Sequence, residues 1–572
     1  MDAVLIMVLS FVGYIAAYQL YGRFIGKKIF NLSNENTTPA VEMQDGVDYV
    51  PTKKGIIFGH HFTSIAGTGP IVGPAIGVIW GWVPALIWVL VGNVVMGAVH
   101  DFGSLVISLR NQGKSISDVT ARYINPRTRT IFFILVLLEL WIVIAVFALI
   151  IGIIFNFYPQ SVFPVWCEIP ISIILGYALY KKGAKLGLST AIAVTVMYIT
   201  VVLGHFIPLK MPAIGGIPAT GVWASILLIY AFIASTLPVT TLLQPRDFIN
   251  SWQLLIAMAL LIIGIFASAF GGALHVVAPA VRMTPEGAPP MWPMLFITIA
   301  CGAISGFHSL VSSGTSAKQV HYEEDALFVG YGSMITEGFL AVLAIIAVAA
   351  GIGIAYQLPD GQVLTGTAAW THHYTSWAAA AGLASKIGSF VEGAANMISF
   401  VGIPKKIGIV IMGVFVASFA GTTLDTATRI QRYVIQELGT TVKAKFLEEK
   451  YTATAVAVIT AGLLTFATGP DGKGALALWP LFGATNQALA ALALLTITMY
   501  LKQRGGAKFV VGLIPAVFMI VMTMWGLLEN EASFISQGKP LLYIVNAIVI
   551  LITVWMTLET IVKWFSKDKV TV

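Results

Sequence analysis

The stretch that decides the fold is GHHFTSIAGTGPIVGP, residues 59–74. Three glycines and two prolines fall within residues 67–74, in the middle of an otherwise apolar segment. Backbone that leaves the helix inside a bilayer survives only where protein buries it or where it lines a wet cavity. A kinked helix or a close-packing face of small residues is the alternative. The polar neighbours Thr63, Ser64 and Thr68 favour an unwound segment with a function.

The composition is that of a polytopic membrane protein. Of the 572 residues, 57% are hydrophobic and 10% charged, against about 25% charged in soluble domains. The net charge of +7 comes from short loops between apolar runs, so it predicts orientation in a lipid bilayer and no nucleic-acid partner. Cys167 and Cys301 lie in apolar surroundings, which predicts packing residues and neither a disulfide framework nor a metal site.

Fifteen segments are apolar and long enough to be predicted as spans. They are residues 2–21, 55–79, 82–109, 130–155, 166–181, 187–208, 221–243, 251–275, 293–316, 326–355, 405–427, 451–468, 475–500, 509–528 and 540–563.

A sixteenth candidate, residues 377–400, contains Lys386 and Glu392. If it lies on the surface or re-enters, every basic loop falls on one side, as cytoplasmic loops require. We therefore predict fifteen spans, with the N-terminus outside and the C-terminus, including the basic tail 563–569, in the cytoplasm. An ordinary sixteenth span with a local exception to the charge rule is the alternative.

A second break is predicted in residues 221–243, where Ser235, Thr236 and Pro238 fall near mid-span. This span is five places after the first broken one and runs the opposite way. Paired broken helices in two inverted halves are typical of transporter sites at the bilayer midplane. The arrangement resembles the leucine-transporter fold. It divides the chain into an N-terminal helix and loop (1–54), a ten-helix core (55–427), and a basic loop with four further helices (428–572).

The unwound backbone predicts the chemistry of the site. Free N–H groups at the start of a helix attract a carboxylate, and the free carbonyls near residues 65–67 suit a cation. The predicted substrate-binding residues are Thr68, Gly69, Ile71, Val72 and Gly73 from the first break, and Ser235, Thr236 and Val239 from the second.

Coupling-ion candidates form two groups. Ser312, Ser313 and Thr315, placed on core helix eight, could complete a sodium site with the Ile65 carbonyl, or could merely bond to their own helix. His308, Glu139 and Glu337 are ionisable groups at membrane depth, where the default interpretation is functional. They are candidate proton carriers, with a neutral acid between helices or a satisfied core histidine as the alternatives.

Asp425 and Arg429 stand four residues apart near the cytoplasmic end of their span. The spacing allows an ion pair on one helix face, either a gate latch or a structural helix-end pair.

A third interrupted helix is predicted in LWPLFGATNQALAAL, residues 478–492. No P-loop and no His-Glu-x-x-His motif occurs, so we expect neither an enzyme nor a resident cofactor or metal.

Four strings are similar to the carbon starvation protein A family. They are GHHFTSIAGTGPIVGPAIGVIWGWVPALIWVLVGNVVMGAVHDF, SSGTSAKQ, GTTLDTATRIQRY and LWPLFGATNQ. The resemblance implies a bacterial inner-membrane transporter for peptides and pyruvate under nutrient limitation, with proton-driven pyruvate uptake. It supplies no substrate ligands.

The sequence therefore predicts a secondary active importer of a small carboxylate or short peptide, coupled to protons. The alternatives are a sodium-coupled symporter of the same substrates, or a channel or sensor that reuses the fold. The oligomeric state is not predicted.

Overall fold

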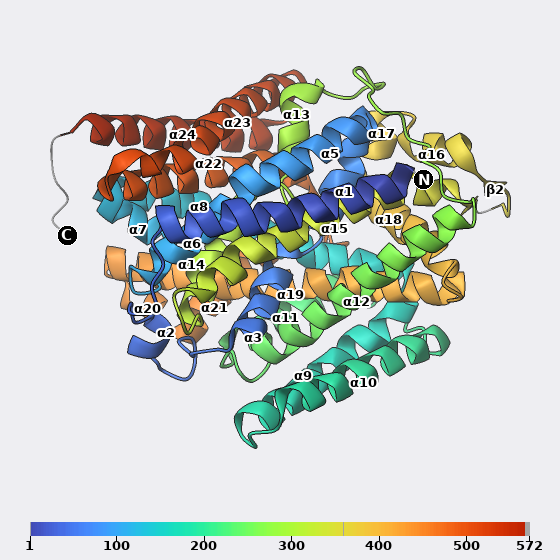
Figure 1. Ribbon diagram of the computed structural model, residues 1–572, viewed down its shortest axis with the longest axis horizontal. Coiled ribbons are helices and arrows are strands. Elements are labelled where there is room, and N and C mark those ends of the chain that lie inside the picture. The colour runs from blue at the N-terminus through green and yellow to red at the C-terminus, as the bar shows by residue number, and fades with distance from the viewer. Residues whose placement is uncertain (1, 359, 567–572) are drawn as a thin grey trace.

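The computed structural model describes residues 2–358 and 360–566, and Figure 1 shows a bundle of long helices aligned with its long axis. Within these residues the strands are one antiparallel pair, β1 (Tyr356–Gln357) and β2 (Val363–Leu364). Twelve described helices are long and apolar enough to cross a membrane, or thirteen when a bent pair counts as one span. The chain is thus an all-α, multi-pass membrane protein. Part of the basic tail, residues 567–569, lies outside the described residues.

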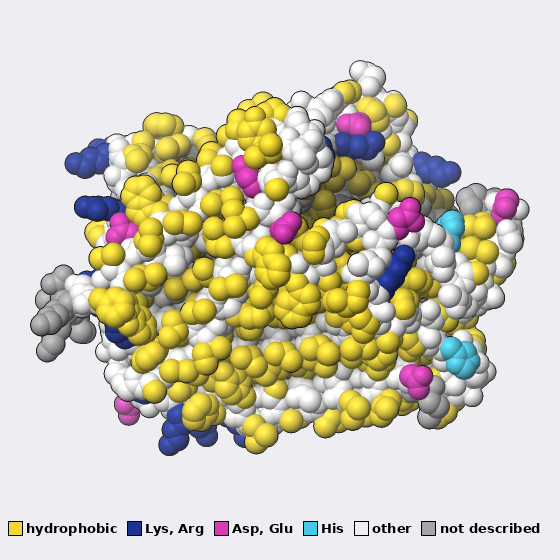
Figure 2. All heavy atoms as spheres, turned by 90° about the horizontal axis from the view of Figure 1, so that it is seen from above, with side chains coloured by type: hydrophobic (Ala, Val, Ile, Leu, Met, Phe, Trp, Pro, Cys, Tyr) yellow, Lys and Arg dark blue, Asp and Glu magenta, His cyan; other side chains and the backbone are white. Residues whose placement is uncertain are grey.

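The outer helices turn apolar side chains away from the protein. Leu5 of α1 (Asp2–Ala17), Ile174 of α9 (Val162–Tyr180) and Ile192 of α10 (Leu186–Phe206) are all exposed. Figure 2 shows hydrophobic side chains across the middle of the surface, while Lys and Arg side chains gather toward its left and right ends. Because apolar surface of this extent is stable only against lipid, the pattern fits a bilayer around the middle of the bundle.

The first break is confirmed. Helix α3 (Lys54–Ala66) ends at Gly67, and α4 (Gly69–Gly77) starts two residues later at an angle of 40°. Gly67 has a φ of +47°, a conformation that side chains with a Cβ rarely adopt. We call residues 67–68 the first interruption.

The second break is not where the sequence predicted it. Helix α11 (Ala219–Thr236) ends before Pro238, and a separate long helix, α12, spans Leu243–Phe270. Lys450 donates a hydrogen bond to the Thr236 carbonyl (3.1 Å), and Arg429 donates one to the Ala234 carbonyl (3.2 Å). These donors cap a helix end, so Pro238 follows a finished span and the predicted broken helix at 221–243 is wrong.

The second interrupted segment lies further along the chain. Helix α13 (Met291–Thr298) is followed by seven non-helical residues, and α14 (Gly306–Gly314) then completes the segment. We call residues 299–305 the second interruption. The remaining α-helices are α2 (Pro39–Glu42), α5 (Trp82–Val91), α6 (Ala98–Leu109), α7 (Ile116–Tyr123), α8 (Pro126–Phe157), α15 (Ser333–Ala349), α16 (Gly366–Tyr374), α17 (Trp377–Ala380), α18 (Leu383–Ser399), α19 (Lys405–Val442), α20 (Lys445–Glu448), α21 (Lys450–Thr465), α22 (Trp479–Gln503), α23 (Val510–Ser536) and α24 (Pro540–Phe565).

The predicted count of fifteen spans is not confirmed. Two of the predicted spans fall outside the thirteen: α21 has only 16 residues, and α13–α14 is interrupted. Helix α18, within the sixteenth candidate, is also absent from the candidate spans among described residues. Helix α22 runs unbroken for 25 residues with Pro480 in its first turn, where proline is tolerated. The third interrupted helix is therefore also a wrong prediction.

Four pairs of helices that are distant along the chain pack closely together. Helix α12 packs on α3, and α22 packs on α14. Helix α8 packs along α19, and α11 packs on α21. Helices α9 and α10 form a hairpin at the margin of the bundle, at the bottom of Figure 1.

Candidate functional site

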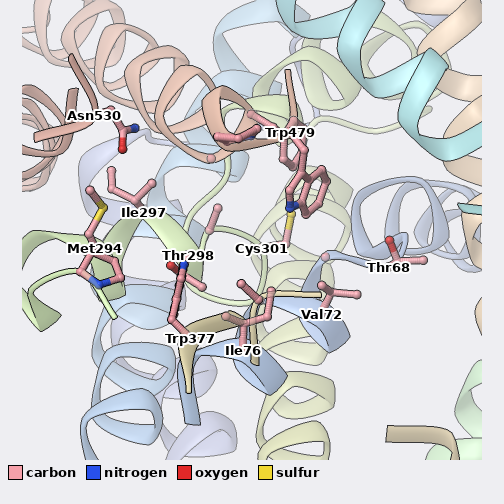
Figure 3. A pocket seen from close by; sticks show the side chains of 18 of the residues that line it. Thr68, Val72, Ile76, Met294, Ile297, Thr298, Cys301, Trp377, Trp479 and Asn530 are labelled. Atoms are coloured by element: carbon pink, nitrogen blue, oxygen red, sulfur yellow. The ribbon is translucent and has the colours of Figure 1, made fainter. Parts of the chain in front are cut away.

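A cavity of about 720 Å³ lies between the two interruptions. Its floor and walls come from α3–α4 and α13–α14, with contributions from α8, α19, α22 and α23. Figure 3 shows Thr68, Val72 and Ile76 on one side, with Thr298 and Cys301 facing them from the other interrupted segment. Most of the lining is apolar, including Phe147, Phe307, Trp377 and Trp479. Such a cavity would favour a small ligand with a few fixed polar contacts.

The structure separates the predicted substrate residues into two groups. Thr68, Gly69, Val72 and Gly73 line the cavity, as does Ile65, whose carbonyl was predicted as a cation ligand. The other predicted residues, Ile71, Ser235, Thr236 and Val239, are not among its lining residues.

Three residues of the second group, Ser235, Thr236 and Val239, serve local structure instead. The hydroxyls of Ser235 and Thr236 donate to carbonyls one turn back in α11, at 3.2 and 2.8 Å. The Val239 N–H donates to the Val47 carbonyl at 3.0 Å. Their predicted place beside the first interruption is wrong, because the break at Pro238 is a helix end.

The sequence missed the cavity residues of the second interrupted segment, including Thr298 at the end of α13 and Ala300 and Cys301 of the second interruption. Only Gly302 within IACGAIS, residues 299–305, is a poor helix former, so the local signal was weak. The close approach of the two segments was also invisible. A Cβ placed on Gly69 would collide with the side chain of Cys301, so the opposing wall touches the backbone of α4 directly.

Two backbone donors are free at the start of α4. The Thr68 carbonyl accepts from the N–H groups of Ile71 (3.2 Å) and Val72 (2.9 Å). The N–H groups of Thr68 and Gly69 make no hydrogen bond within the described residues. Both residues line the cavity, and the N-terminal end of a helix carries a partial positive charge. This end of the cavity can therefore bind a carboxylate.

The predicted sodium ligands lie elsewhere than expected. Ser312 and Ser313 belong to α14, and Thr315 follows it. Ser313 donates to the Ser309 carbonyl (2.7 Å), and Thr315 Oγ1 lies 3.1 Å from His60 Nε2. Ser312 Oγ has no partner in the described part of the chain. None of the three is a lining residue of the cavity.

The predicted proton carriers are all fully buried. His308 Nδ1 lies 3.0 Å from Asp101 Oδ2, and His308 Nε2 lies 3.5 Å from Glu337 Oε2. Glu139 stands apart on α8, and neither of its carboxyl oxygens has a hydrogen-bond partner among described residues. The structure thus brings two of the three candidates together and leaves the third alone.

The predicted Asp425–Arg429 pair is also wrong. Asp425 binds Arg246, and it accepts a hydrogen bond from the Tyr230 hydroxyl at 2.9 Å. Arg429 instead binds Asp48 at 2.8 Å, in the loop before α3. Spacing along one helix could not reveal either partner, because both come from distant segments.

Asp48 anchors a strap, residues 47–52, to side chains of α19. Its carboxylate also binds Arg432 (3.1 Å) and accepts from the Tyr433 hydroxyl (2.7 Å). Burial alone would raise the pKa of Asp48, but Arg432, Arg429, the Tyr433 hydroxyl and Lys318 outweigh it and lower the pKa to about 2. Elsewhere in the strap, the Val50 and Thr52 N–H groups donate to the carbonyls of Lys318 and Gln319. The strap therefore ties the loop before α3 to α19 and to the segment that follows α14.

A bundle of membrane-crossing helices around a cavity between two interrupted helices is the architecture of a membrane transporter. The chain belongs to the carbon starvation protein CstA family, whose sequence model matches residues 2–526. It is 33% identical to a peptide transporter CstA of Campylobacter jejuni, over 94% of this chain and 82% of that one. It is also 33% identical to the pyruvate/proton symporter BtsT of Escherichia coli, over 92% of this chain and 81% of that one.

Among solved structures, the fold is similar to MhsT in complex with L-phenylalanine. The TM-score is 0.49 at 10% identity, over 83% of this chain and 98% of that one. The family and the names of its members identify this chain as a transporter and not an enzyme.

Proposed function

We propose that the protein imports a small carboxylate or a short peptide across the bacterial inner membrane by proton-coupled alternating access, during carbon starvation. The observation that carries the proposal is the pair of free N–H groups of Thr68 and Gly69 at the wall of an apolar cavity. Unpaired backbone donors away from water are costly, and a substrate carboxylate would satisfy both.

The packing supports two inverted halves of the leucine-transporter type. In this interpretation α3–α4 and α13–α14 are the first helices of the two halves. Each packs on the last helix of its own half, α12 and α22 respectively. The transport core then runs from residue 54 to residue 503, with α9–α10 inserted and α1, α23 and α24 outside it. This replaces the core of residues 55–427 predicted from the sequence.

The structure corresponds to a state open toward one end. The cavity reaches Trp377 of α17 and residues 529–539 at the end of α23. Figure 1 shows α16 and α17 at the right end and α2 and α20 at the left. The strap at Asp48 lies between α2 and α3. With the N-terminus outside and the C-terminus in the cytoplasm, the open end is outside and the strap closes the cytoplasmic end.

Glu139 is the residue we propose to carry the proton. It lies one helical turn from Val143, which lines the cavity, on the same face of α8. A buried carboxyl without a partner is stable only in its neutral form, so its ionisation requires a change of surroundings. Such a change is what alternating access would supply. The likeness to a pyruvate/proton symporter favours protons over sodium, and His308 and Glu337 stay further candidates.

The two substrate classes differ in what they require. Pyruvate needs little beyond the carboxylate site at the start of α4. A peptide also needs an anchor for its amino group, and Glu529 at the cavity rim is available in this state. The volume of about 720 Å³ is within the range of ligand pockets, so it admits either substrate.

The experiment is uptake of labelled pyruvate and dipeptides into proteoliposomes, with proton and sodium gradients imposed separately. We expect saturable uptake that an inward proton gradient drives uphill. Glu139→Gln should abolish the uphill component and leave substrate exchange at equal pH. Acceleration by sodium alone would contradict proton coupling, and unsaturable flux would indicate a channel.

A further inference from the structure

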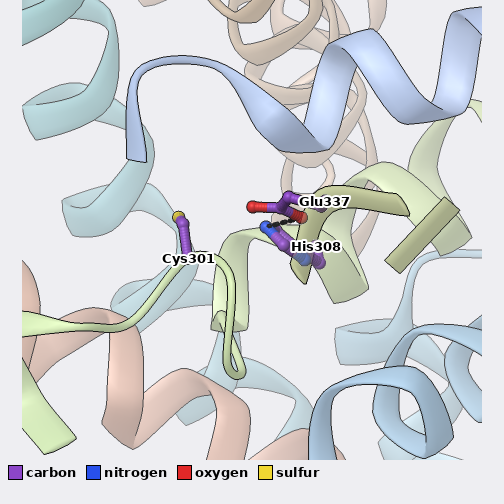
Figure 4. Close-up of side chains that lie close together, drawn as sticks. All are labelled: Cys301, His308 and Glu337. Atoms are coloured by element: carbon purple, nitrogen blue, oxygen red, sulfur yellow. Dashed lines mark ion pairs between the residues drawn. The ribbon is translucent and has the colours of Figure 1, made fainter. Parts of the chain in front are cut away.

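One group of side chains at the cavity has the composition of a metal site. Cys301, His308 and Glu337 each offer one ligand atom, and these atoms all lie within 4.8 Å of one another. Figure 4 shows Cys301 on the extended backbone of the second interruption, with the His308–Glu337 pair beside it. From the sequence, Cys301 was predicted to be a packing residue, because it lies in apolar surroundings.

Two of the three ligand atoms have no other partner. His308 Nε2 and Glu337 Oε2 are buried and make no hydrogen bond in the described part of the chain. Their separation of 3.5 Å matches two ligands of one ion better than a short ion pair. Buried polar atoms without a partner are costly, so an ion between them would remove that cost.

The surroundings orient both side chains as metal ligands. Asp101 lies 3.0 Å from His308 Nδ1, so it can accept a hydrogen bond from the Nδ1–H. The lone pair of Nε2 is then available to bind a metal ion. This carboxylate–histidine arrangement is the usual support of a metal-bound imidazole. The Gly302 N–H donates to Glu337 Oε1 at 3.1 Å and leaves Oε2 free.

The donor set selects the class of ion. Thiolate, imidazole and carboxylate together suit zinc-class ions, whereas magnesium and calcium prefer oxygen alone. Ligand atoms around one zinc ion lie roughly 3 to 4 Å apart, so the thiol would need to move by about 1 Å. Cys301 also lines the cavity, which gives the ion a way in and leaves a fourth position toward the cavity.

We propose that Cys301, His308 and Glu337 bind one zinc-class ion at the cavity wall, and that the bound ion inhibits transport. The ion would join the second interruption and α14 to α15, and so fix the wall on which Gly69 packs. The inhibitory part rests on the proposed transport function, whereas the binding part does not.

Binding is tested on the purified full chain with cadmium, whose bond to a thiolate gives an ultraviolet charge-transfer band. Cys167 is the matched control, since it is the other cysteine of the chain. We expect one equivalent of cadmium to produce the band in the wild type and in Cys167→Ser, and no band in Cys301→Ser. Asp101→Asn should weaken binding by about 10- to 100-fold. No band in the wild type, or a band lost only with Cys167→Ser, would overturn the site.

Inhibition is tested separately by adding zinc to proteoliposomes that show uptake. Zinc should slow uptake by the wild type and by Cys167→Ser, and Cys301→Ser should be resistant relative to its own uptake without zinc. Equal inhibition of both cysteine variants, or binding with unchanged uptake, would overturn the inhibitory role. Because cadmium binding needs no substrate, a failure of the proposed transport function would leave the binding result intact.

Discussion

The two interruptions lose their helix in different ways. At the first, the Thr68 and Gly69 N–H groups have no protein partner within the described residues. At the second, side chains from other helices pair three of the unwound backbone groups, although the N–H groups of Ala300 and Cys301 make no hydrogen bond among the described residues. Trp88 donates to the Ile299 carbonyl (2.8 Å), Asn93 donates to the Gly302 carbonyl (3.0 Å), and Glu337 accepts from the Gly302 N–H (3.1 Å).

This difference separates binding from support. Backbone that already has partners is held in place and offers little to a ligand, whereas backbone without them can bind one. The first interruption is therefore suited to hold the substrate, and the paired part of the second, at Ile299 and Gly302, to form a fixed wall opposite it. Four predictions test this contrast, from the largest expected effect to the smallest.

Gly69→Leu should have the largest effect. Its Cβ would collide with Cys301, and the remaining atoms would fill the cavity beside the free N–H groups. We expect uptake to fall to background, with a loss of about 1–3 kcal/mol in the free energy of unfolding from overpacking. Gly13→Leu is the control, because a Cβ on Gly13 meets nothing within 4 Å. Normal uptake by Gly69→Leu would refute the binding role of the first interruption.

Asn486→Ala tests the support of the second interruption. The Asn486 side chain accepts from the Phe307 N–H at 2.9 Å and from the Ser305 hydroxyl at 3.2 Å. Its removal leaves these buried donors unpaired, which should cost about 1–3 kcal/mol of the free energy of unfolding. Thermal unfolding of the purified protein measures the loss, with Thr195→Ala on the outer helix α10 as the control. An unchanged melting temperature would show that the wall does not depend on this side chain.

The Asp48 strap provides a third test. Here ion pairs of a side chain, and not hydrogen bonds of the backbone, hold a segment in place. Because the pKa of Asp48 is lowered to about 2, below its value of about 3.9 in an unfolded chain, its contribution is complete above about pH 4. It is lost as the pH falls through about 2, and it is of the order of 2 kcal/mol. Asp48→Asn should therefore lower stability by a constant amount between pH 5 and 8. A difference that changes steeply across that range would contradict the assignment.

The sequence predicts a break where the residues of the break cause it, and does not where distant residues hold the backbone. The first interruption was predictable because Gly67, Gly69 and Pro70 are themselves poor helix formers. The second was not, because its backbone is held by Trp88, Asn93 and Asn486, which are far away along the chain. Arg429 was predicted to pair with Asp425 four residues away, but its partner Asp48 is 381 residues away.

The prediction of a broken helix at Pro238 was wrong for a related reason. Proline is common just after a helix as well as inside a broken one, and local sequence does not distinguish the two. What distinguishes them is the pair of donors, Arg429 and Lys450, at the last carbonyls of α11. Proline and glycine in the sequence therefore locate breaks. Hydrogen-bond partners from distant segments determine whether a break is the end of a span or an unwound segment inside one.

Ser235→Ala and Thr236→Ala should have the smallest effects, and they complete the comparison at the break that proved to be a helix end. Both hydroxyls donate only to carbonyls of α11, and neither residue lines the cavity. Loss of such local bonds should change the free energy of unfolding by about 0.5 kcal/mol or less and leave the apparent affinity for substrate unchanged. Thr68→Ala, at the first interruption, is the matched threonine whose side chain does line the cavity. If Ser235→Ala or Thr236→Ala weakened substrate affinity more than Thr68→Ala, residues 235–239 would have to approach the substrate in another state of the transport cycle.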